Sequence, residues 1–408
     1  MTDLLERYDA AFAGRDAPFA FVDLDALRAN ADHLLAQAGR FPVRVASKSL
    51  RCLEVLRRVL DHPAPTGTAG FQGVLAFTPA EALHLAEHGF EDVVVAYPSV
   101  DRAALCTVAE RVAKRLPGRI ALMVDSAEGA AHVSRAARAV GVRLPVAVDL
   151  DTGWRPVPGV AIGAARSPVR TPEQAGALVR TLADDPHLLV VGLMAYEAQV
   201  AGVGDRVPGK PLRSLAIRGV QAGSMRDLAD RLPRIVAAAR TELARHGQQL
   251  DFVNGGGTGS LARTAAAGAV TELAAGSGLY APTLFDAYRS LRLAPAAWFA
   301  LPVVRRPGPG VVTVLGGGYV ASGVAGADRV PSPTLPAGLR LTGQEGAGEV
   351  QTPLRGAAAD RLAIGDRVYF RHAKAGELCE RFTTLLLVEG DRVVDEVATY
   401  RGDGHAFL

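Results

Sequence analysis

Between about residue 40 and residue 280 the sequence repeats one pattern eight times. Each repeat begins with a short apolar run rich in β-branched residues, which ends in small or polar residues and precedes a segment of helical periodicity. Most of these runs are apolar throughout, as is typical of parallel strands covered on both faces. Eight strand-then-helix units predict an α/β fold of the (β/α)8 barrel type, with an open doubly wound sheet as the alternative. The runs are VRVASK, GVLAFT, DVVVAYP, IALMVDS, PVAVDLDTG, VVGLMAYE, DFVNGGGTG and ELAAGSGLY.

The pattern changes after residue 290. Short alternating runs such as VVTVLGGGYV and FTTLLLVEGDRVVDEVATY are joined by Gly and Pro turns and show little helical periodicity. We therefore predict a barrel over residues 31–290 and a separate, mostly antiparallel β domain over residues 291–408. The early run PFAFVDLDAL lies outside the eight units, so the strand of residues 1–30 is expected to join the β domain. Two long connections, after Gly153 and Tyr196, are expected on the face where the barrel strands end.

Composition argues against several classes of function. The net charge is +3, and no basic stripe or basic run with interleaved aromatics is present, so neither nucleic acid nor membrane binding is expected. No apolar run approaches the roughly 18 residues of a membrane-spanning helix. Cys52, Cys106 and Cys379 are scattered and form neither a disulfide framework nor a close zinc pair, which favours a reducing cytoplasm.

Lys48 ends the first apolar run and is one of only four lysines among 45 basic residues. An amine can be deprotonated and can attack a carbonyl, whereas a guanidinium cannot. A solvated surface lysine is the alternative interpretation. The apolar VRVAS segment before it favours a partly desolvated Lys48 that condenses with an aldehyde to form a Schiff base.

Two glycine-rich segments, NGGGTG and AAGSGLY, end the seventh and eighth runs. Such segments let backbone amides approach an anion, and barrels commonly hold a phosphate at these two positions. Tight turns without a ligand are the alternative. A lysine that traps an aldehyde and a phosphate cradle together describe pyridoxal 5'-phosphate (PLP). Arg155 could then face the pyridine nitrogen or form a loop salt bridge with Asp149 or Asp151, and Tyr196 could contact the cofactor or be structural.

The segments PFAFVDLDALRAN, VRVASKS, FTPAEALHLAEHGFEDVVVAYP, DLDTGWRP, GLMAYEAQ, NGGGTG and TELAAGSGLY, in this order, resemble fold-type III PLP enzymes with an alanine racemase-like N-terminal barrel. More narrowly, the chain resembles the D-threonine aldolase and D-serine dehydratase branch, often called amino acid deaminase/aldolase. The resemblance covers nearly the whole chain. It implies a homodimer and a catalytic Schiff base at Lys48. The cofactor-binding residues that it implies are Lys48, Arg155, Tyr196, Gly257, Thr258, Gly276, Ser277 and Tyr280.

The resemblance implies a lyase that acts on a D-3-hydroxy amino acid, by aldol cleavage or by dehydrative deamination. An amino acid racemase is the first alternative, and it would need a second acid/base group, for which Tyr319 is the candidate. A PLP-binding protein without turnover is the second alternative. Such proteins are typically a barrel alone, so the additional β domain argues against this alternative.

Metal-dependent members of this branch have a histidine followed two residues later by Cys or Asp in the C-terminal domain. The corresponding segment here reads RHAKAGELCERF. Aligning on Cys379 places Glu377 at the histidine position, and His372 lies five residues earlier. These three residues are the candidate ligands for a divalent metal such as Mn, Zn or Mg. The alternative is a buried Cys379 and a Glu377 engaged in a salt bridge.

Overall fold

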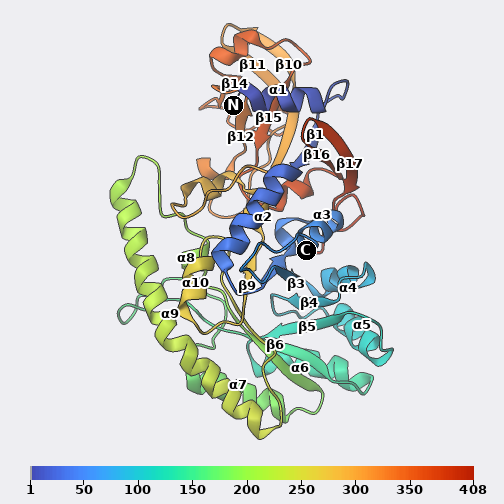
Figure 1. Cartoon of the computed structure of the whole chain (residues 1–408), viewed down its shortest axis with the longest axis vertical. Helices are drawn as coiled ribbons and strands as arrows, with labels where there is room; N and C mark the ends of the chain where they lie inside the picture. The colour runs from blue at the N-terminus through green and yellow to red at the C-terminus, as the bar shows by residue number, and fades with distance from the viewer. Residues whose placement is uncertain (1) are drawn as a thin grey trace.

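The computed structural model describes residues 2–408 and shows two parts stacked along the long axis of the molecule (Figure 1). In the lower part, eight parallel strands close into a barrel in which each strand pairs with the next and β9 pairs with β2. The barrel prediction is therefore confirmed, and the open sheet is excluded. The strands are β2 (Val43–Ala46), β3 (Phe71–Ala76), β4 (Asp92–Val95), β5 (Arg119–Val124), β6 (Leu144–Asp149), β7 (Leu188–Ala195), β8 (Phe252–Gly255) and β9 (Glu272–Ala275).

Helices surround the barrel, and several begin at caps that the sequence displays. Thr78 caps α4 by accepting a hydrogen bond from the amide of Glu81 at 3.1 Å. Thr171 and Gln174 form a reciprocal capping box at the start of α7. The helices of this layer are α2 (Leu24–Ala38), α3 (Leu53–Leu60), α4 (Pro79–Glu87), α5 (Arg102–Ala113), α6 (Ala127–Ala139), α7 (Pro172–Asp184), α8 (Ala198–Ala201), α9 (Pro211–Arg245), α10 (Leu261–Ala267) and α11 (Ser277–Tyr280).

Helix α9 occupies most of the connection after Tyr196, which the sequence pattern left as a loop. It has 35 residues, begins with Pro211 in its first turn, and runs along α7 at the edge of the molecule (Figure 1). Its first turns carry exposed apolar side chains: Leu212 is 82% and Leu215 is 59% accessible. Because this end buries little apolar surface, it lacks the one-sided apolar pattern by which a helix is recognised in sequence.

The upper part is a mixed β-sheet built from both ends of the chain. β1 lies near its centre, antiparallel to β10 and parallel to β16. The sheet order is β13-β14-β11-β10-β1-β16-β17, and β15 pairs with β10 and β12. The strands are β1 (Phe19–Asp23), β10 (Ala297–Gly308), β11 (Val311–Leu315), β12 (Ser332–Leu335), β13 (Arg340–Leu341), β14 (Gln351–Arg355), β15 (Arg367–Arg371), β16 (Thr384–Glu389) and β17 (Arg392–Ala398).

Helix α1 (Thr2–Ala11) covers this sheet with an aromatic cluster. Tyr8 and Phe12 pack against Phe21, and the Tyr8 ring also meets Trp298 edge to face, with the ring centroids 5.7 Å apart. These side chains are at most 1% exposed. Burying large aromatic side chains contributes a few kcal/mol each, so this cluster ties the N-terminal segment to the C-terminal sheet.

Asn30 holds the segment that leaves the barrel against α2, the helix that follows β1. Its side chain, 1% exposed on α2, donates to the carbonyls of Leu279 and Ala294 and accepts from the amide of Ala294 at 2.8 Å. Removing a buried amide that makes these three hydrogen bonds would reduce the stability of the fold. Asn30 therefore holds α2 against the segment around Leu279 and Ala294, through which the chain leaves the barrel.

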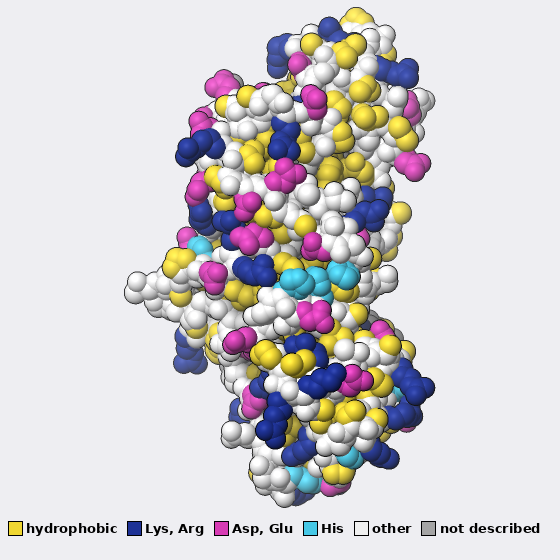
Figure 2. Space-filling model, turned by 90° about the vertical axis from the view of Figure 1, so that its right-hand side faces the viewer, with side chains coloured by type: hydrophobic (Ala, Val, Ile, Leu, Met, Phe, Trp, Pro, Cys, Tyr) yellow, Lys and Arg dark blue, Asp and Glu magenta, His cyan; other side chains and the backbone are white. Residues whose placement is uncertain are grey.

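The last residues of the chain return to the barrel. Tyr400 bonds the carbonyl of Arg51, and the ring of His405 lies 4.5 Å from that of His84 on α4. Figure 2 shows histidines gathered on this face, where His88 lies 4.3 Å from His84. Burial, together with His88 and His405, lowers the pKa of His84 to about 4. Within residues 2–408, no helix combines the length and the apolar character needed to cross a bilayer.

Candidate active site

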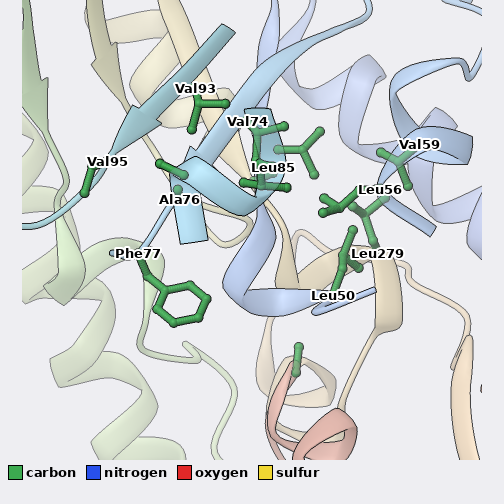
Figure 3. Close-up of a cluster of buried hydrophobic side chains, with 14 of the residues drawn as sticks. Leu50, Leu56, Val59, Val74, Ala76, Phe77, Leu85, Val93, Val95 and Leu279 are labelled. Atoms are coloured by element: carbon green, nitrogen blue, oxygen red, sulfur yellow. The ribbon is translucent and has the colours of Figure 1, made fainter. Parts of the chain in front are cut away.

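Lys48 lies in a short 3-10 turn, Ser47–Ser49, immediately after β2. Its Nζ donates a 2.6 Å hydrogen bond to the hydroxyl of Tyr97, and it sits 5.2 Å from the centre of that ring. The side chain is exposed, so the partly desolvated Lys48 expected from the apolar segment before it is not what the structure shows. Beneath the turn, Leu50 is fully buried beside Leu279, as Figure 3 shows. The base of the Lys48 turn is therefore packed in the core, while its amine contacts Tyr97.

The turn after β9 packs directly against the Lys48 turn. A Cβ atom on Gly276 would lie 2.7 Å from the carbonyl oxygen of Ala46 and 2.8 Å from Ser49 Oγ, so only glycine fits there. The hydroxyls of Ser277 and Ser49 are 3.1 Å apart. Lys48 and the second glycine-rich segment are thus neighbours, as the PLP hypothesis requires.

The two glycine-rich turns are bonded to each other. Thr258 Oγ1 accepts from the amide of Gly278 at 3.0 Å, and a Cβ on Gly278 would lie 2.6 Å from Thr258 Cγ2. Tyr196 lies over the first of these turns, because a Cβ on Gly257 would be 3.0 Å from Cε2 of its ring. The structure therefore brings together Lys48, Tyr196 and both turns.

Glu197 supports these turns and was not identified from the sequence. Its carboxylate is 1% exposed and accepts hydrogen bonds from the hydroxyls of Ser260 and Thr264 and from the amide of Gly256. Burial raises the pKa of Glu197, while the bonds from Ser260 and Thr264 oppose that rise. The sequence did contain a signal for Glu197: an acidic residue directly after a strand, between Tyr196 and an apolar segment.

The arginine at the mouth is Arg166 rather than Arg155. Arg155 pairs with Asp151 at 2.9 Å, and its side chain is 55% exposed, which is the loop salt bridge that the sequence left open. The guanidinium of Arg166 instead lies 5.7 Å from the ring centre of Tyr97 and 5.8 Å from that of Tyr196. Arg166 therefore supplies the cation beside the rings that frame the mouth.

Burial and nearby charges shift the pKa values of two further groups at the mouth. Burial raises the pKa of Asp149 to about 7, the negative charge of Asp125 adds to this rise, and Arg166 opposes it. Burial by itself would raise the pKa of Tyr97, but Lys48 and Arg166 together outweigh burial and lower it. Groups with shifted pKa values concentrated around an exposed amine are typical of a catalytic site.

Tyr280, which was expected at the phosphate, lies elsewhere, and three other polar residues have structural contacts. The side chain of Tyr280 is fully buried and its hydroxyl donates to the Leu50 carbonyl at 3.1 Å, so it packs beneath the Lys48 turn and not at the phosphate position. Asn254 donates to Glu272 at 2.8 Å inside the barrel. Thr78 is used as a helix cap. Tyr319, the candidate second acid/base, packs between Phe299 and Phe382.

The predicted metal ligands do not converge. Cys379 is 1% exposed and donates to the Leu50 carbonyl, whereas Glu377 accepts from the amide of Ser322 at 2.9 Å. The short helical turn Glu377–Glu380 directs these two side chains to different partners. His372 is buried and lines the same cavity as Glu377, but residues 2–408 contain no group of three His, Cys, Asp or Glu side chains arranged to hold a metal. The alignment on Cys379 is therefore wrong as a metal site.

Glu81 links the C-terminal segment to the start of α4 beside the Lys48 turn. It is fully buried and accepts from the Phe77 amide at 2.6 Å and from the Tyr400 hydroxyl at 2.9 Å. Burial raises the pKa of Glu81 to about 7, and hydrogen bonds from Ser47, Phe77 and Tyr400 oppose the rise.

Because the folded pKa of Glu81 exceeds its unfolded value, the stability contributed by the protonated form is complete below about pH 4.5 and is lost as the pH rises through about 7. We expect Glu81→Gln, relative to wild type, to be more stable at pH 8 than at pH 5, by about 3 kcal/mol. Urea unfolding at both pH values measures this difference, with exposed Glu110→Gln as the control. The same relative stability at both pH values would show that Glu81 does not titrate in this range.

Comparison with known proteins agrees with this geometry. Residues 22–282 match the family model described as alanine racemase, N-terminal domain. A D-threonine aldolase from an Arthrobacter species is 29% identical over 266 residues, covering 64% of this chain and 60% of the aldolase. The chain thus spans less than two thirds of the length of that relative.

Solved structures show the same fold over nearly the whole chain. The D-threonine aldolase from Filomicrobium marinum superposes with a TM-score of 0.75 at 21% identity, covering 95% of each chain. The D-threo-3-hydroxyaspartate dehydratase from Delftia sp. HT23 superposes with a TM-score of 0.70 at 20% identity, covering 95% of this chain and 98% of the dehydratase. The resemblance inferred from the motifs is therefore confirmed, and the chain belongs to the alanine racemase N-terminal domain family.

Proposed function

We propose that this protein is a PLP-dependent lyase that acts on a D-3-hydroxy amino acid, by aldol cleavage or dehydrative deamination. The observation that carries the proposal is the contact of the Lys48 turn with the glycine turn after β9, where Gly276 lies against Ala46 and Ser49. That turn is itself bonded to the glycine turn after β8 through Thr258. The aldolase and dehydratase relatives support a lyase over a racemase.

The residues at the mouth fit PLP. Lys48 would hold the aldehyde carbon covalently, and the turns around Gly257–Gly259 and Gly276–Gly278, where side chains are small or absent, would hold the phosphate. Tyr196 and Arg166 would flank the ring. When bound, PLP supplies an electron sink for negative charge that develops at the substrate α-carbon.

Three side chains of the protein would have distinct roles in the reaction. With PLP bound, Lys48 Nζ would be placed to move a proton to or from the substrate α-carbon. Tyr97 Oη, bonded to Nζ at 2.6 Å, orients the amine and, with a lowered pKa, can exchange a proton with it. Asp149, with a pKa near 7, is a candidate to accept or deliver the proton of the β-hydroxyl.

No divalent metal is part of this proposal. Cys379 is committed to the Leu50 carbonyl, and the cavity lined by His372 and Glu377 is also lined by Lys374, whose charge opposes that of a metal ion. We further propose a homodimer in the cytoplasm that binds neither nucleic acid nor membranes. The exposed Leu212 and Leu215 on α9 support a partner surface, and the free cysteines support a reducing compartment.

Product analysis of the PLP-loaded enzyme tests the proposal. D-threonine is expected to give acetaldehyde and glycine if the reaction is aldol cleavage. D-threo-3-hydroxyaspartate is expected to give oxaloacetate and ammonia if it is dehydration. The products are measured by coupled assay and by chiral chromatography of the remaining substrate. Inversion of an amino acid without cleavage would indicate a racemase, and an intact cofactor spectrum without any product would indicate a PLP-binding protein.

A further inference from the structure

A cavity of about 390 Å³ lies between the loop after β11 and the loop that follows β15. It borders the Lys48 turn, because the backbone of Gly376 lies against the carbonyl of Lys48, and Tyr400, next to the lining residue Arg401, bonds the carbonyl of Arg51. Its volume matches that of small-molecule sites. The polar lining includes Tyr319, Ser322, His372, Lys374, Arg381 and Arg401.

The lining carries an excess of positive charge. Lys374, Arg381 and Arg401 have no ion-pair partner within residues 2–408, and Lys374 Nζ bonds only the hydroxyl of Ser322, at 2.6 Å. Of the two acids in the lining, Glu380 is neutralised by Arg51 and Glu377 accepts from the Ser322 amide. Unpaired cations around a concave surface repel a divalent metal and attract an anion.

His372 adds a second, independent indication of a ligand. It is 4% exposed and lines the cavity, and although the Ala297 backbone lies near the ring, neither ring nitrogen reaches hydrogen-bond geometry with a residue of the described chain. Burial, with the neighbouring charge of Arg371, lowers the pKa of His372 to about 3, so the ring is neutral at physiological pH and presents one N–H donor. A buried polar side chain without a partner is unfavourable unless a ligand completes it.

We propose that this cavity is a binding site for a carboxylate group, held chiefly by Lys374 with Arg381, Arg401 and the ring of His372. Two sources of the carboxylate share this chemistry. The first source is the side chain of an acidic 3-hydroxy amino acid bound at the neighbouring Lys48, and this possibility rests on the proposed function. The second source is a separate small dicarboxylate, whose binding does not depend on the proposed function.

Calorimetric titration of the PLP-loaded full chain with malonate at low ionic strength tests the site. Wild type is expected to bind one malonate, and Lys374→Met and Arg401→Gln are each expected to weaken binding about tenfold or more. Lys114→Met, at an exposed lysine after α5, is the matched control and should bind as wild type. Absence of malonate binding to wild type, or unchanged binding in both cavity variants, would overturn the proposal.

Steady-state kinetics distinguish the two sources. If the carboxylate belongs to the substrate, malonate competes with D-threo-3-hydroxyaspartate, and Lys374→Met raises KM for that substrate about tenfold but not KM for D-threonine. If it belongs to a separate anion, malonate binds without competing, and both KM values change equally. Either result supports a carboxylate site. A wild type that has lyase activity but does not bind malonate overturns this inference alone, whereas an inactive but malonate-binding wild type overturns only the proposed lyase.

Discussion

Replacing Lys48 with alanine is expected to give a colourless protein with lyase activity reduced by roughly a thousandfold or more. Lys48 is the one amine at the mouth of the barrel within residues 2–408, since Lys114 follows α5, Lys210 precedes α9 and Lys374 lines the neighbouring cavity. Without it, PLP has no covalent attachment and the α-proton has no base. Visible absorbance of the dialysed, PLP-reconstituted protein and the product assay measure the two losses.

The Lys48→Arg variant tests whether Lys48 acts through covalent attachment of the cofactor or only through its positive charge. A guanidinium retains the positive charge beside Tyr97 but does not condense with an aldehyde, so this variant is also expected to be colourless and inactive. Lys114→Ala is the surface control and should retain colour and activity. A Lys48→Ala protein that remains yellow after dialysis would refute the role of Lys48 and with it the proposed function.

Replacing Glu197 with alanine is expected to reduce the free energy of unfolding by about 3 kcal/mol or more and to weaken PLP binding. The change leaves the hydroxyls of Ser260 and Thr264 and the amide of Gly256 without their buried acceptor. These donors hold the glycine turn after β8, so the cradle loses its fixed shape as well as its stability.

Glu197→Gln tests whether the acceptor or the acid matters. Its carbonyl oxygen can still accept from a hydroxyl, but its NH2 group faces a donor, so a smaller loss of about 1–2 kcal/mol is expected. Urea unfolding and a PLP titration followed by absorbance provide both measurements, and exposed Glu110→Ala is the control. An unfolding free energy and PLP affinity in Glu197→Ala equal to those of wild type would show that the turn does not depend on this carboxylate.

The barrel could be predicted from sequence because parallel strands buried on both faces leave an unmistakable trace of uninterrupted apolar residues. The same regularity led to the candidate site, since polar residues that follow such strands meet at one mouth. The structure brings Lys48, Tyr196, Gly257, Thr258 and Gly276 together, and their role in binding a cofactor stays a prediction. Their positions depend on backbone topology alone, and the repeat of strand and helix specifies that topology.

The remaining features depend on side-chain choices that spacing does not specify. Arg155 and Arg166 lie on one long connection, and only its folded path shows that the first pairs with Asp151 and the second stands between Tyr97 and Tyr196. Cys379 was misplaced for a similar reason, because the direction of its side chain is set by a short helical turn. Helix α9 was missed because its exposed first half has no apolar face to reveal it.

The position of β1 governs the order in which the molecule can be assembled on the ribosome. This strand emerges among the first residues, but its neighbours β10 and β16 are synthesised some 270 and 360 residues later. The barrel strands are contiguous in sequence and can close while β1 still waits with its backbone groups unpaired, a state that invites aggregation. A fragment that carries residues 291–408 without the N-terminal segment would have a gap in the middle of its sheet, so the upper part cannot be produced as an independent module by cutting the chain once.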